Sequence, residues 1–369
     1  MPPARPGVVQ LVPALDAGGA ERATLEIAKA LVEAGRPSIV VSAGGRLVER
    51  LVAEGSEHIT LPLARKSTAA FRAVPELRRV LLRPDVGIAH VRSRLPGWLA
   101  RIALRGATRR PAIVTTAHGL YSPGWYSAIM TRGDRIICVS NAVRDHMLRS
   151  FPQADPARLI VIPRGIDAHE FPYGYQPDDA WRRAFQAEFP QLTGGPLLTL
   201  PARGTRLKGH ADAIRLLADL GVRGIEARLL LLGVAQDGRS AYVEELERLA
   251  RSLGVADVVA MTPPRADIRD VFGASTLVLQ LSTKPEAFGR TVVEALAMCR
   301  PVLGYGHGGV GELLAELYPA GRVPPGDRVR LAERAAELLR AAPPIAPLAH
   351  YRVEEMRAAT LAVYDELTQ

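Results

Sequence analysis

Residues 7–35 read GVVQLVPALDAGGAERATLEIAKALVEAG, and this stretch decides the fold. Its apolar beginning, residues 8–12, is typical of a buried strand. Two glycines, Gly18 and Gly19, form the next turn, and residues 20–34 then repeat apolar side chains at helical spacing until Gly35 ends the helix. A strand, a glycine turn and an amphipathic helix together predict the beginning of a βαβ unit in a parallel sheet.

The same alternation of short apolar runs and amphipathic stretches recurs along the whole chain. The strands that it predicts are 8–12, 38–42, 86–91, 113–116, 135–139 and 160–162, then 197–200, 227–232, 258–261, 277–281 and 301–304. Further predicted helices are 208–219, 240–252, 291–299 and 353–367. The chain has 369 residues, more than the roughly 250 to 300 at which one hydrophobic core stops growing. We therefore predict an α/β protein with two Rossmann-like domains that face each other across a cleft.

Pro, Gly, Tyr and Asp concentrate in residues 171–196, and we place the hinge there. The prediction is a first domain over residues 1–170 and a second over residues 171–349. The Pro-rich residues 341–347 separate a last helix from the second domain. That helix is free to pack on either domain, so residues 350–369 are a candidate completion of the first.

The bulk composition is that of a folded globular protein, with 48% apolar and 23% charged residues. No apolar run approaches the ~20 residues that cross a bilayer, and the first apolar stretch leads into no cleavage site, so we expect a cytoplasmic protein. The two cysteines, Cys138 and Cys299, lie in apolar contexts. They fit a reducing compartment, and two thiols alone cannot form a four-ligand zinc site.

The net charge of +9 is concentrated in one part of the chain. Residues 65–110 hold twelve basic side chains against two acidic ones, Glu76 and Asp85, a local excess of +10. Such a stretch favours an anionic membrane surface or an anionic acceptor, and the alternative is a solvated basic face. No nucleic-acid-binding motif accompanies it, so we expect no nucleic acid partner.

Two glycine-containing turns are candidate phosphate sites. Gly18 and Gly19 open a helix, whose unpaired N–H groups and dipole favour a phosphate; the alternative is a tight turn with no ligand. In the second half, Arg203 and Lys208 follow the predicted strand 197–200, and open α/β sheets bind ligands at the carboxyl ends of their strands. The two cations could therefore hold a diphosphate and neutralise charge on a leaving group, although both could also face solvent.

The most specific motif is EAFGRTVVE, residues 286–294. Its two carboxylates are Glu286, in a predicted loop, and Glu294, about one turn into a predicted helix. Carboxylates accept hydrogen bonds from vicinal hydroxyls, so ribose and hexose are natural targets. The alternative is an acidic pair that the helix dipole alone would favour.

Taken in order, these motifs resemble the family-four retaining glycosyltransferases of GT-B fold. The resemblance includes the E-x7-E segment, the Arg-x4-Lys-Gly element, the early Gly-Gly-Ala-Glu and the sequence PRGID at 163–167, and it spans nearly the whole chain. Residues 115–122, TTAHGLYS, are similar to members that build bacterial lipopolysaccharide and other surface glycans. Two positions depart from the family pattern: Ala202 stands where Gly is familiar, and His307 where relatives often carry Asp.

The resemblance also implies roles for individual residues. Arg203 and Lys208 would hold the donor diphosphate, Glu294 the ribose hydroxyls and Glu286 the hydroxyls of the donor sugar. His118 would lie near the reacting sugar, with a purely structural histidine as the alternative. The implied catalytic residues are His118, Glu286, Arg203 and Lys208, and the implied donor-binding residues are Gly18, Gly19, Arg203, Lys208, Glu286, Phe288, Gly289, Arg290, Thr291 and Glu294.

The implied activity is retaining transfer of a hexosyl group from a nucleotide sugar, a UDP-sugar rather than a GDP-sugar, to a glycan or lipid-linked acceptor. With no Asp-x-Asp pair and no HExxH motif, we expect no metal. The expected location is cytoplasmic, with the basic stretch at the inner face of the plasma membrane. Three alternatives remain: a nucleotide-sugar 2-epimerase, a non-catalytic nucleotide-sugar-binding partner, and an oxidoreductase, against which the missing GxGxxG counts.

Overall fold

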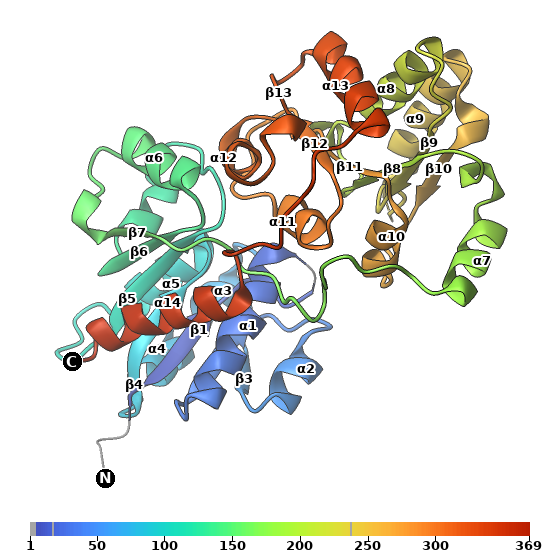
Figure 1. Ribbon diagram of the computed structural model, residues 1–369. Helices are drawn as coiled ribbons and strands as arrows, with labels where there is room; N and C mark the ends of the chain where they lie inside the picture. Colours follow the sequence, from blue (N-terminus) through green and yellow to red (C-terminus); the bar gives the residue numbers. More distant parts are fainter. Residues whose placement is uncertain (1–4, 17, 237) are drawn as a thin grey trace. The chain divides into compact units, whose positions relative to one another are not determined.

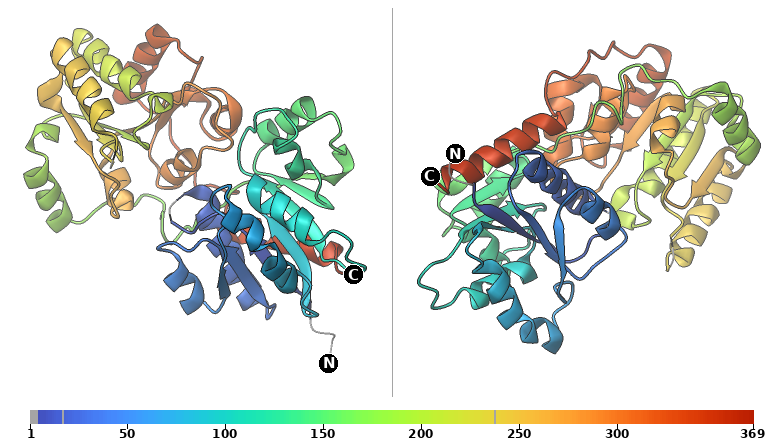
Figure 2. Two further views of the ribbon diagram at one scale, coloured as in Figure 1. Left: turned by 180° about the vertical axis from the view of Figure 1, so that it is seen from behind. Right: turned by 90° about the horizontal axis from the view of Figure 1, so that it is seen from below.

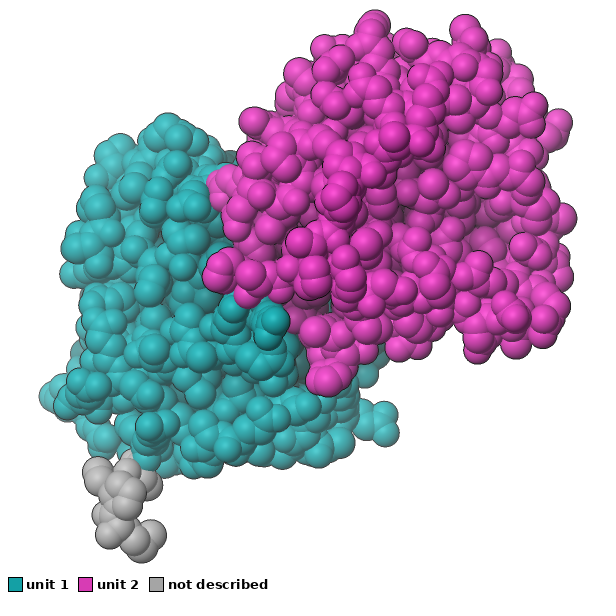
Figure 3. Space-filling view, viewed as in Figure 1, with its two compact units in different colours: residues 1–165, 352–369 teal, residues 166–351 magenta. Residues whose placement is uncertain are grey.

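The computed structural model describes residues 5–16, 18–236 and 238–369. Residues 1–4 and Ala17, which belong to the predicted first domain, lie outside the described residues. The chain divides into two compact units (Figure 3). The first unit combines the residues up to Gly165 with Arg352–Gln369, and the second is Ile166–Tyr351.

The first unit is built on a seven-stranded parallel sheet with the order β3-β2-β1-β4-β5-β6-β7 (Figure 1). The strands are β1 (Gly7–Leu11), β2 (Ser38–Ser42), β3 (Glu57–Thr60), β4 (Val86–Val91), β5 (Ala112–Ala117), β6 (Arg135–Cys138) and β7 (Leu159–Val161). The helices are α1 (Gly19–Glu33), α2 (Val48–Ala53), α3 (Thr68–Arg72), α4 (Val74–Leu81), α5 (Arg94–Ala103), α6 (Asn141–Ser150) and α14 (Val353–Glu366), with 3₁₀ turns η1 (Ser127–Thr131) and η2 (Pro156–Arg158).

The last helix of the chain completes the core of the first unit. Val353, Met356 and Tyr364 of α14 are buried in one cluster with Val8 of β1 and Ile88 of β4, and two views show α14 lying along this unit (Figures 1 and 2). Full burial of a large apolar side chain stabilises a fold by roughly 1.5 to 3 kcal/mol. The first unit therefore depends on residues at both ends of the chain.

The second unit is built on a six-stranded parallel sheet with the order β10-β9-β8-β11-β12-β13. The strands are β8 (Leu197–Pro201), β9 (Arg228–Leu232), β10 (Val259–Thr262), β11 (Leu277–Gln280), β12 (Val302–Tyr305) and β13 (Arg322–Val323). The helices are α7 (Asp179–Glu188), α8 (His210–Val222), α9 (Ser240–Ser252), α10 (Ile268–Ala274), α11 (Arg290–Ala297), α12 (Gly308–Leu317) and α13 (Arg328–Arg340), with 3₁₀ turns η3 (Pro190–Leu192), η4 (Arg206–Lys208), η5 (Ala256–Val258) and η6 (Pro319–Gly321).

Each sheet has a point at which its strand order reverses. In the first unit β1 pairs with both β2 and β4, and in the second unit β8 pairs with both β9 and β11. At such a point the loops that follow the two neighbouring strands diverge and leave a crevice at their carboxyl ends. The α/β prediction with two Rossmann-like halves is confirmed, and these two points are where ligand-binding loops are expected.

The structure corrects three details of the predicted elements. Residues 171–196, where we placed the hinge, contain α7, and the division between the units falls at Gly165/Ile166. The predicted helix 208–219 begins only at His210, because Gly209 has φ +76 and interrupts it. The helix predicted over 291–299 ends at Ala297, and Cys299 has φ 62, outside the helical region.

Candidate active site

In the second unit, the loop that follows β8 packs closely against the end of β11. A Cβ atom at Gly209 would lie 2.0 Å from the carbonyl oxygen of Leu281, so the approach requires glycine at this position. The backbone N–H of Thr283 also donates to the Leu207 carbonyl at 2.9 Å. These contacts hold the β8 loop and the β11 loop together at the point of strand reversal.

An ion pair joins these two loops. Lys208 Nζ lies 2.6 Å from Glu286 Oε1, and the side chains are 25% and 22% exposed. The Ser282 hydroxyl also hydrogen-bonds Glu286. The sequence predicted both charged residues as ligand-binding groups but not their contact with each other. The pair fixes an ammonium and a carboxylate side by side, still accessible, at the carboxyl end of the sheet.

Hydrogen bonds extend this pair to the start of α11. Ser282 Oγ also lies 3.0 Å from Gln280 Oε1, so its one proton is shared between this oxygen and Glu286, and Gln280 Nε2 donates to Thr291 Oγ1 at 3.3 Å. His307 Nε2 lies 2.7 Å from the Ser282 carbonyl oxygen, to which it can only donate. The histidine that departs from the family pattern therefore anchors the β11 loop.

Glu294 lies one turn into α11, as predicted, but its surroundings are more closed than those of Glu286. Its Oε1 accepts a hydrogen bond from Arg290 Nε at 2.9 Å, and its side chain is only 8% exposed. An ion pair in such a place fixes both side chains. A ribose hydroxyl could reach Glu294 only along the exposed side of this pair.

The segment between the two glutamates is held by the beginning of α12. The N–H of Gly309 donates to the Glu286 carbonyl at 2.8 Å, and a Cβ at Gly309 would lie 2.5 Å from Cα of Phe288. Gly289 precedes α11 with φ +112. Phe288 is buried, its ring 6.0 Å from that of Tyr351. The Phe288 side chain therefore packs against Tyr351, and its contact with the donor stays a prediction.

Arg203 differs from Lys208 because no carboxylate among the described residues pairs with it. Its side chain is exposed directly after β8, and within the described parts of the chain its guanidinium makes no ion pair. Arg206, two residues before Lys208, instead pairs with Glu245. Arg203 is therefore a cation available to a ligand, whereas Arg206 already has a carboxylate partner on the surface.

In the first unit, His118 follows β5 and meets an arginine that the sequence did not single out as a site residue. Arg164 Nη1 donates to the Gly19 carbonyl at 2.8 Å, and Arg164 Nη2 lies 2.6 Å from His118 Nδ1. Since a guanidinium can only donate, Nδ1 must accept, and the proton of the neutral ring lies on Nε2. The sequence signal that could have identified Arg164 is a charged residue between Pro163 and Gly165, shortly after the last strand of the unit.

The surroundings of His118 keep its ring neutral. Burial, together with the positive charges of Arg164 and Arg92, lowers the pKa of His118 well below its usual value. Its Nε2 is buried and has no hydrogen-bond partner within residues 5–16, 18–236 and 238–369. His118 and Thr360 of α14 both line a small cavity of about 20 Å³. His118 is therefore a neutral ring whose Nε2–H is a hydrogen-bond donor.

A second histidine, His90, is buried and has both of its ring nitrogens hydrogen-bonded. His90 Nδ1 lies 2.5 Å from the Tyr364 hydroxyl, and His90 Nε2 lies 2.6 Å from Thr116 Oγ1. Burial lowers the pKa of His90 well below its usual value and lowers that of Arg92 to about 10. His90 has both ring nitrogens occupied, so His118 is the histidine of this pair that can serve a ligand.

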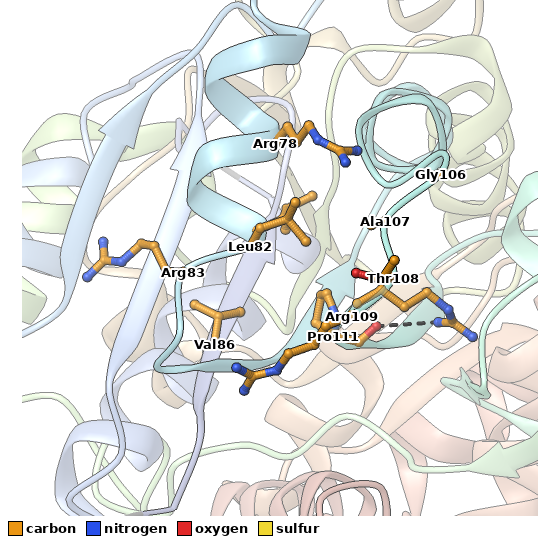
Figure 4. A pocket seen from close by; sticks show the side chains of 11 residues that line it. Arg78, Leu82, Arg83, Val86, Gly106, Ala107, Thr108, Arg109 and Pro111 are labelled. Atoms are coloured by element: carbon orange, nitrogen blue, oxygen red, sulfur yellow. Dashed lines mark hydrogen bonds between the residues drawn. The ribbon is translucent and has the colours of Figure 1, made fainter.

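The basic stretch lines a surface pocket of about 280 Å³ at the edge of the sheet where β4 and β5 begin (Figure 4). Its arginines are largely used within the protein: Arg78 donates to the Ala103 carbonyl, Arg83 pairs with Glu57, and Arg110 pairs with Asp134. The pocket therefore has less free positive charge than its composition indicates.

Neither a metal site nor a membrane span stands out in the described residues. No group of three or more His, Cys, Asp or Glu side chains is placed to hold a metal ion there. Across residues 5–16, 18–236 and 238–369, none of the helices combines the length and apolarity that a bilayer crossing needs.

Buried histidines make the stability of the protein pH-dependent. Burial lowers the pKa of His210 from 6.5 to about 4, so between these values the unfolded chain binds a proton that the folded chain does not. We expect the free energy of unfolding to fall as the pH drops from about 6.5 to about 4, by on the order of 3 kcal/mol from His210. Urea unfolding across this range should show the slope, and His210→Gln should make it shallower, because the contributions of His90 and His118 remain. A slope unchanged by that substitution would contradict the assignment.

Comparison with known proteins identifies the family. Two family models match consecutive parts of the chain, Glycosyltransferase Family 4 over residues 17–170 and Glycosyl transferases group 1 over residues 182–355. The D-inositol 3-phosphate glycosyltransferase of Rhodococcus jostii (strain RHA1) is 32% identical over 187 residues, which cover 50% of this chain and 40% of that protein. The chain thus spans less than half the length of this relative.

Two solved structures share the fold over 98% of the chain. A glycosyltransferase from Rickettsia africae superposes with a TM-score of 0.85 at 25% identity, over 98% of its own length. Anabaena HepE, solved in complex with UDP and glucose, superposes with a TM-score of 0.80 at 19% identity, over 100% of its length. With both family models matched in order along two Rossmann-like units, the chain belongs to the family-four type of GT-B glycosyltransferases.

Proposed function

We propose that the protein is a retaining glycosyltransferase that moves a hexosyl group from a nucleotide sugar to a glycan or lipid-linked acceptor in the assembly of lipopolysaccharide or another surface polysaccharide. The observation that carries the proposal is the pairing of Lys208 with Glu286 at the carboxyl ends of β8 and β11. A cation for a diphosphate and a carboxylate for sugar hydroxyls are side by side there. The similarity of residues 115–122 to surface-glycan enzymes supports the pathway.

In the proposed reaction, charge stabilisation is the main task of the second unit. The bond from the anomeric carbon to the diphosphate breaks, the acceptor oxygen bonds to that carbon from the same face, and the acceptor proton passes to the departing phosphate oxygen. Lys208 and Arg203 would neutralise the charge that develops on the diphosphate. These two cations supply positive charge without a metal ion.

The remaining roles follow from accessibility. Glu286 is exposed enough to accept hydrogen bonds from the donor sugar, whereas Glu294, within its ion pair with Arg290, would accept from the ribose. Gly19 opens α1, and its Cβ position faces open space, so a phosphate could approach its backbone closely. His118 has its Nε2–H buried, so its place near the donor sugar rests on the family resemblance; being neutral, it would not act as a charged acid.

A thermal-shift panel of UDP-, GDP-, ADP- and CMP-linked sugars tests the donor class. Stabilisation grows with ligand concentration relative to Kd, so one nucleotide class should stand out, and we expect it to be UDP. Support for UDP is the fold shared with a protein solved with UDP and glucose. Incubating the best donor without acceptor tests the 2-epimerase alternative, since an epimerase would convert the donor alone. A chain that no nucleotide sugar stabilises would contradict the proposal.

The two glutamates should separate binding from turnover. Glu294→Ala removes the ribose acceptor, so we expect the Kd for the nucleotide sugar to rise about tenfold or more, as loss of a charged hydrogen bond implies. Glu286→Ala should leave Kd within a few-fold and reduce kcat. Calorimetric titration and initial rates measure both quantities. Glu245→Ala, on α9 and paired with Arg206, is the control that should change neither; small, equal effects from both glutamates would refute the assignment.

A further inference from the structure

Aromatic and basic side chains gather where three strands of the first unit end; Lys66 and Trp125 are exposed, and the others are partly buried. Lys66 follows β3, Arg94 follows β4, and the residues Tyr121, Trp125 and Tyr126 follow β5. We call these five residues, with Trp98 of α5, the aromatic–cation cluster. It lies at the carboxyl edge of the sheet, the edge that also carries His118.

Direct contacts make the cluster a single structure. Lys66 Nζ lies 3.6 Å from the centre of the Tyr126 ring, and the Arg94 guanidinium lies 5.3 and 5.4 Å from the rings of Tyr121 and Tyr126. Trp98 Nε1 donates to the Tyr126 carbonyl at 3.0 Å. Cations over aromatic faces at these distances attract the rings and keep both kinds of side chain at the same surface.

Trp125 is the most exposed large aromatic residue described in the first unit. Its side chain is 74% exposed, although its ring is only 5.3 Å from that of Trp98 and 5.9 Å from that of Tyr126. With the rings of Trp98 and Tyr126, Trp125 forms a contiguous aromatic patch after Pro123 and Gly124, and contiguous patches of this kind mark interaction surfaces.

The three loops that form the cluster carry only positive formal charge. Residues 61–67, 92–99 and 118–127, which form its three loops, contain no Asp or Glu. Farther along the basic stretch, by contrast, Arg83 and Arg110 are paired with carboxylates. The partner should therefore be anionic, and it should accept aromatic rings at the boundary between a polar and an apolar phase.

We propose that the aromatic–cation cluster docks the first unit on an anionic lipid bilayer. Trp and Tyr favour the headgroup level of membranes, where their rings meet the acyl boundary and their polar atoms stay hydrated. Lys66, Arg94 and the exposed Arg65 pair with lipid phosphates at the same level. Trp125 is the anchor, and its neighbours supply the charge.

Docking by this edge has a consequence for the proposed acceptor. The backbone N–H of His118 donates to the Tyr121 hydroxyl at 3.3 Å, so the docking surface and the candidate catalytic histidine share one loop. An acceptor held in the bilayer would meet the protein beside His118. The docking itself needs no catalysis, so it can be tested apart from the proposed function.

Vesicles and tryptophan fluorescence test the proposal. The full chain is mixed at low salt with vesicles of phosphatidylglycerol and phosphatidylcholine in equal parts, with the acyl chains brominated near the headgroup, and with vesicles of phosphatidylcholine alone. We expect quenching and co-sedimentation with the anionic vesicles only, both weakened by salt. Trp125→Ser should remove most of the quenching and weaken sedimentation about tenfold or more. Equal binding to neutral vesicles, or undiminished binding of Trp125→Ser, would overturn the proposal.

Two double variants distinguish binding through the aromatic–cation cluster from binding through the basic stretch as a whole. Arg65→Gln/Lys66→Gln and Arg79→Gln/Arg105→Gln each remove two exposed charges from the same basic stretch, but the second pair lies away from the cluster, on α4 and after α5. The first pair should weaken vesicle binding about tenfold or more, and the second by much less. The reverse order would refute the assignment. Melting temperature and nucleotide-sugar binding, unchanged in all variants, show that fold and donor site are intact.

Discussion

Replacing Lys208 by alanine should lower kcat by about 10²- to 10³-fold, because one preorganised donor to a developing negative charge is worth about that much. Lys208 is held by Glu286 at 2.6 Å, so it is already oriented when a diphosphate binds. Initial rates at saturating donor measure the effect. Because both partners remain partly exposed, the melting temperature should change little.

Arg206→Ala is the matched control for this prediction. Arg206 lies on the same turn, η4, but its guanidinium pairs with Glu245. Its removal should leave kcat within a few-fold of the original. The double variant Lys208→Ala/Glu286→Gln then distinguishes two roles: if Lys208 only positions Glu286, its loss adds nothing to Glu286→Gln. A Lys208→Ala protein of near-normal kcat would refute the charge-stabilising role.

Replacing Arg164 by methionine should lower kcat roughly a hundredfold, because an imidazole in the wrong tautomer or orientation is a poor catalytic group. Arg164 holds His118 Nδ1 at 2.6 Å and the Gly19 carbonyl at 2.8 Å, so one side chain orients two predicted site residues. Its positive charge also lowers the pKa of His118. The variant should therefore raise that pKa, and the pH at which activity declines on acidification should rise with it.

Arg164→Lys separates charge from geometry. Lysine keeps the positive charge but lacks the planar fork that reaches two acceptors at fixed directions. We expect the pKa of His118 to stay low and kcat still to fall. Nitrogen chemical shifts of the His118 ring report the tautomer directly. If the shifts and kcat of Arg164→Met both match the original protein, Arg164 does not position His118.

Most strands could be predicted because apolar runs between glycine and proline turns are a strong signal for buried parallel strands. Strand β3 was not predicted, since Glu57–Thr60 alternates little and lies at the sheet edge with its side chains partly exposed. Helix α7 was hidden by the polar composition of residues 171–196. Asp178 accepts a hydrogen bond from the N–H of Trp181 and so caps the start of α7. The ring centres of Trp181 and Phe185 are 4.8 Å apart in a stacked arrangement.

The candidate site shows a different limit of prediction. Motif spacing identified Lys208 and Glu286 separately, because each follows a strand and carries a charge suited to a nucleotide sugar. Their contact depends on β8 and β11 being neighbours, and the two residues are 78 positions apart in the sequence. The contact between Arg164 and His118 likewise depends on the order of β5, β6 and β7. Local patterns identify residues, whereas strand order decides which of them meet.

The path of the chain also sets the order in which the protein can be completed during synthesis. The second unit is one continuous segment, Ile166–Tyr351, inserted into the first, and the N–H of Ile166 donates to the Tyr351 carbonyl at 2.9 Å where the inserted segment begins and ends. The seven strands of the first unit precede the inserted segment in the chain, whereas α14 follows it. During synthesis the inserted segment therefore emerges before α14, while Val8 and Ile88 still lack the helix that covers them, so the older core closes only once α14 has emerged.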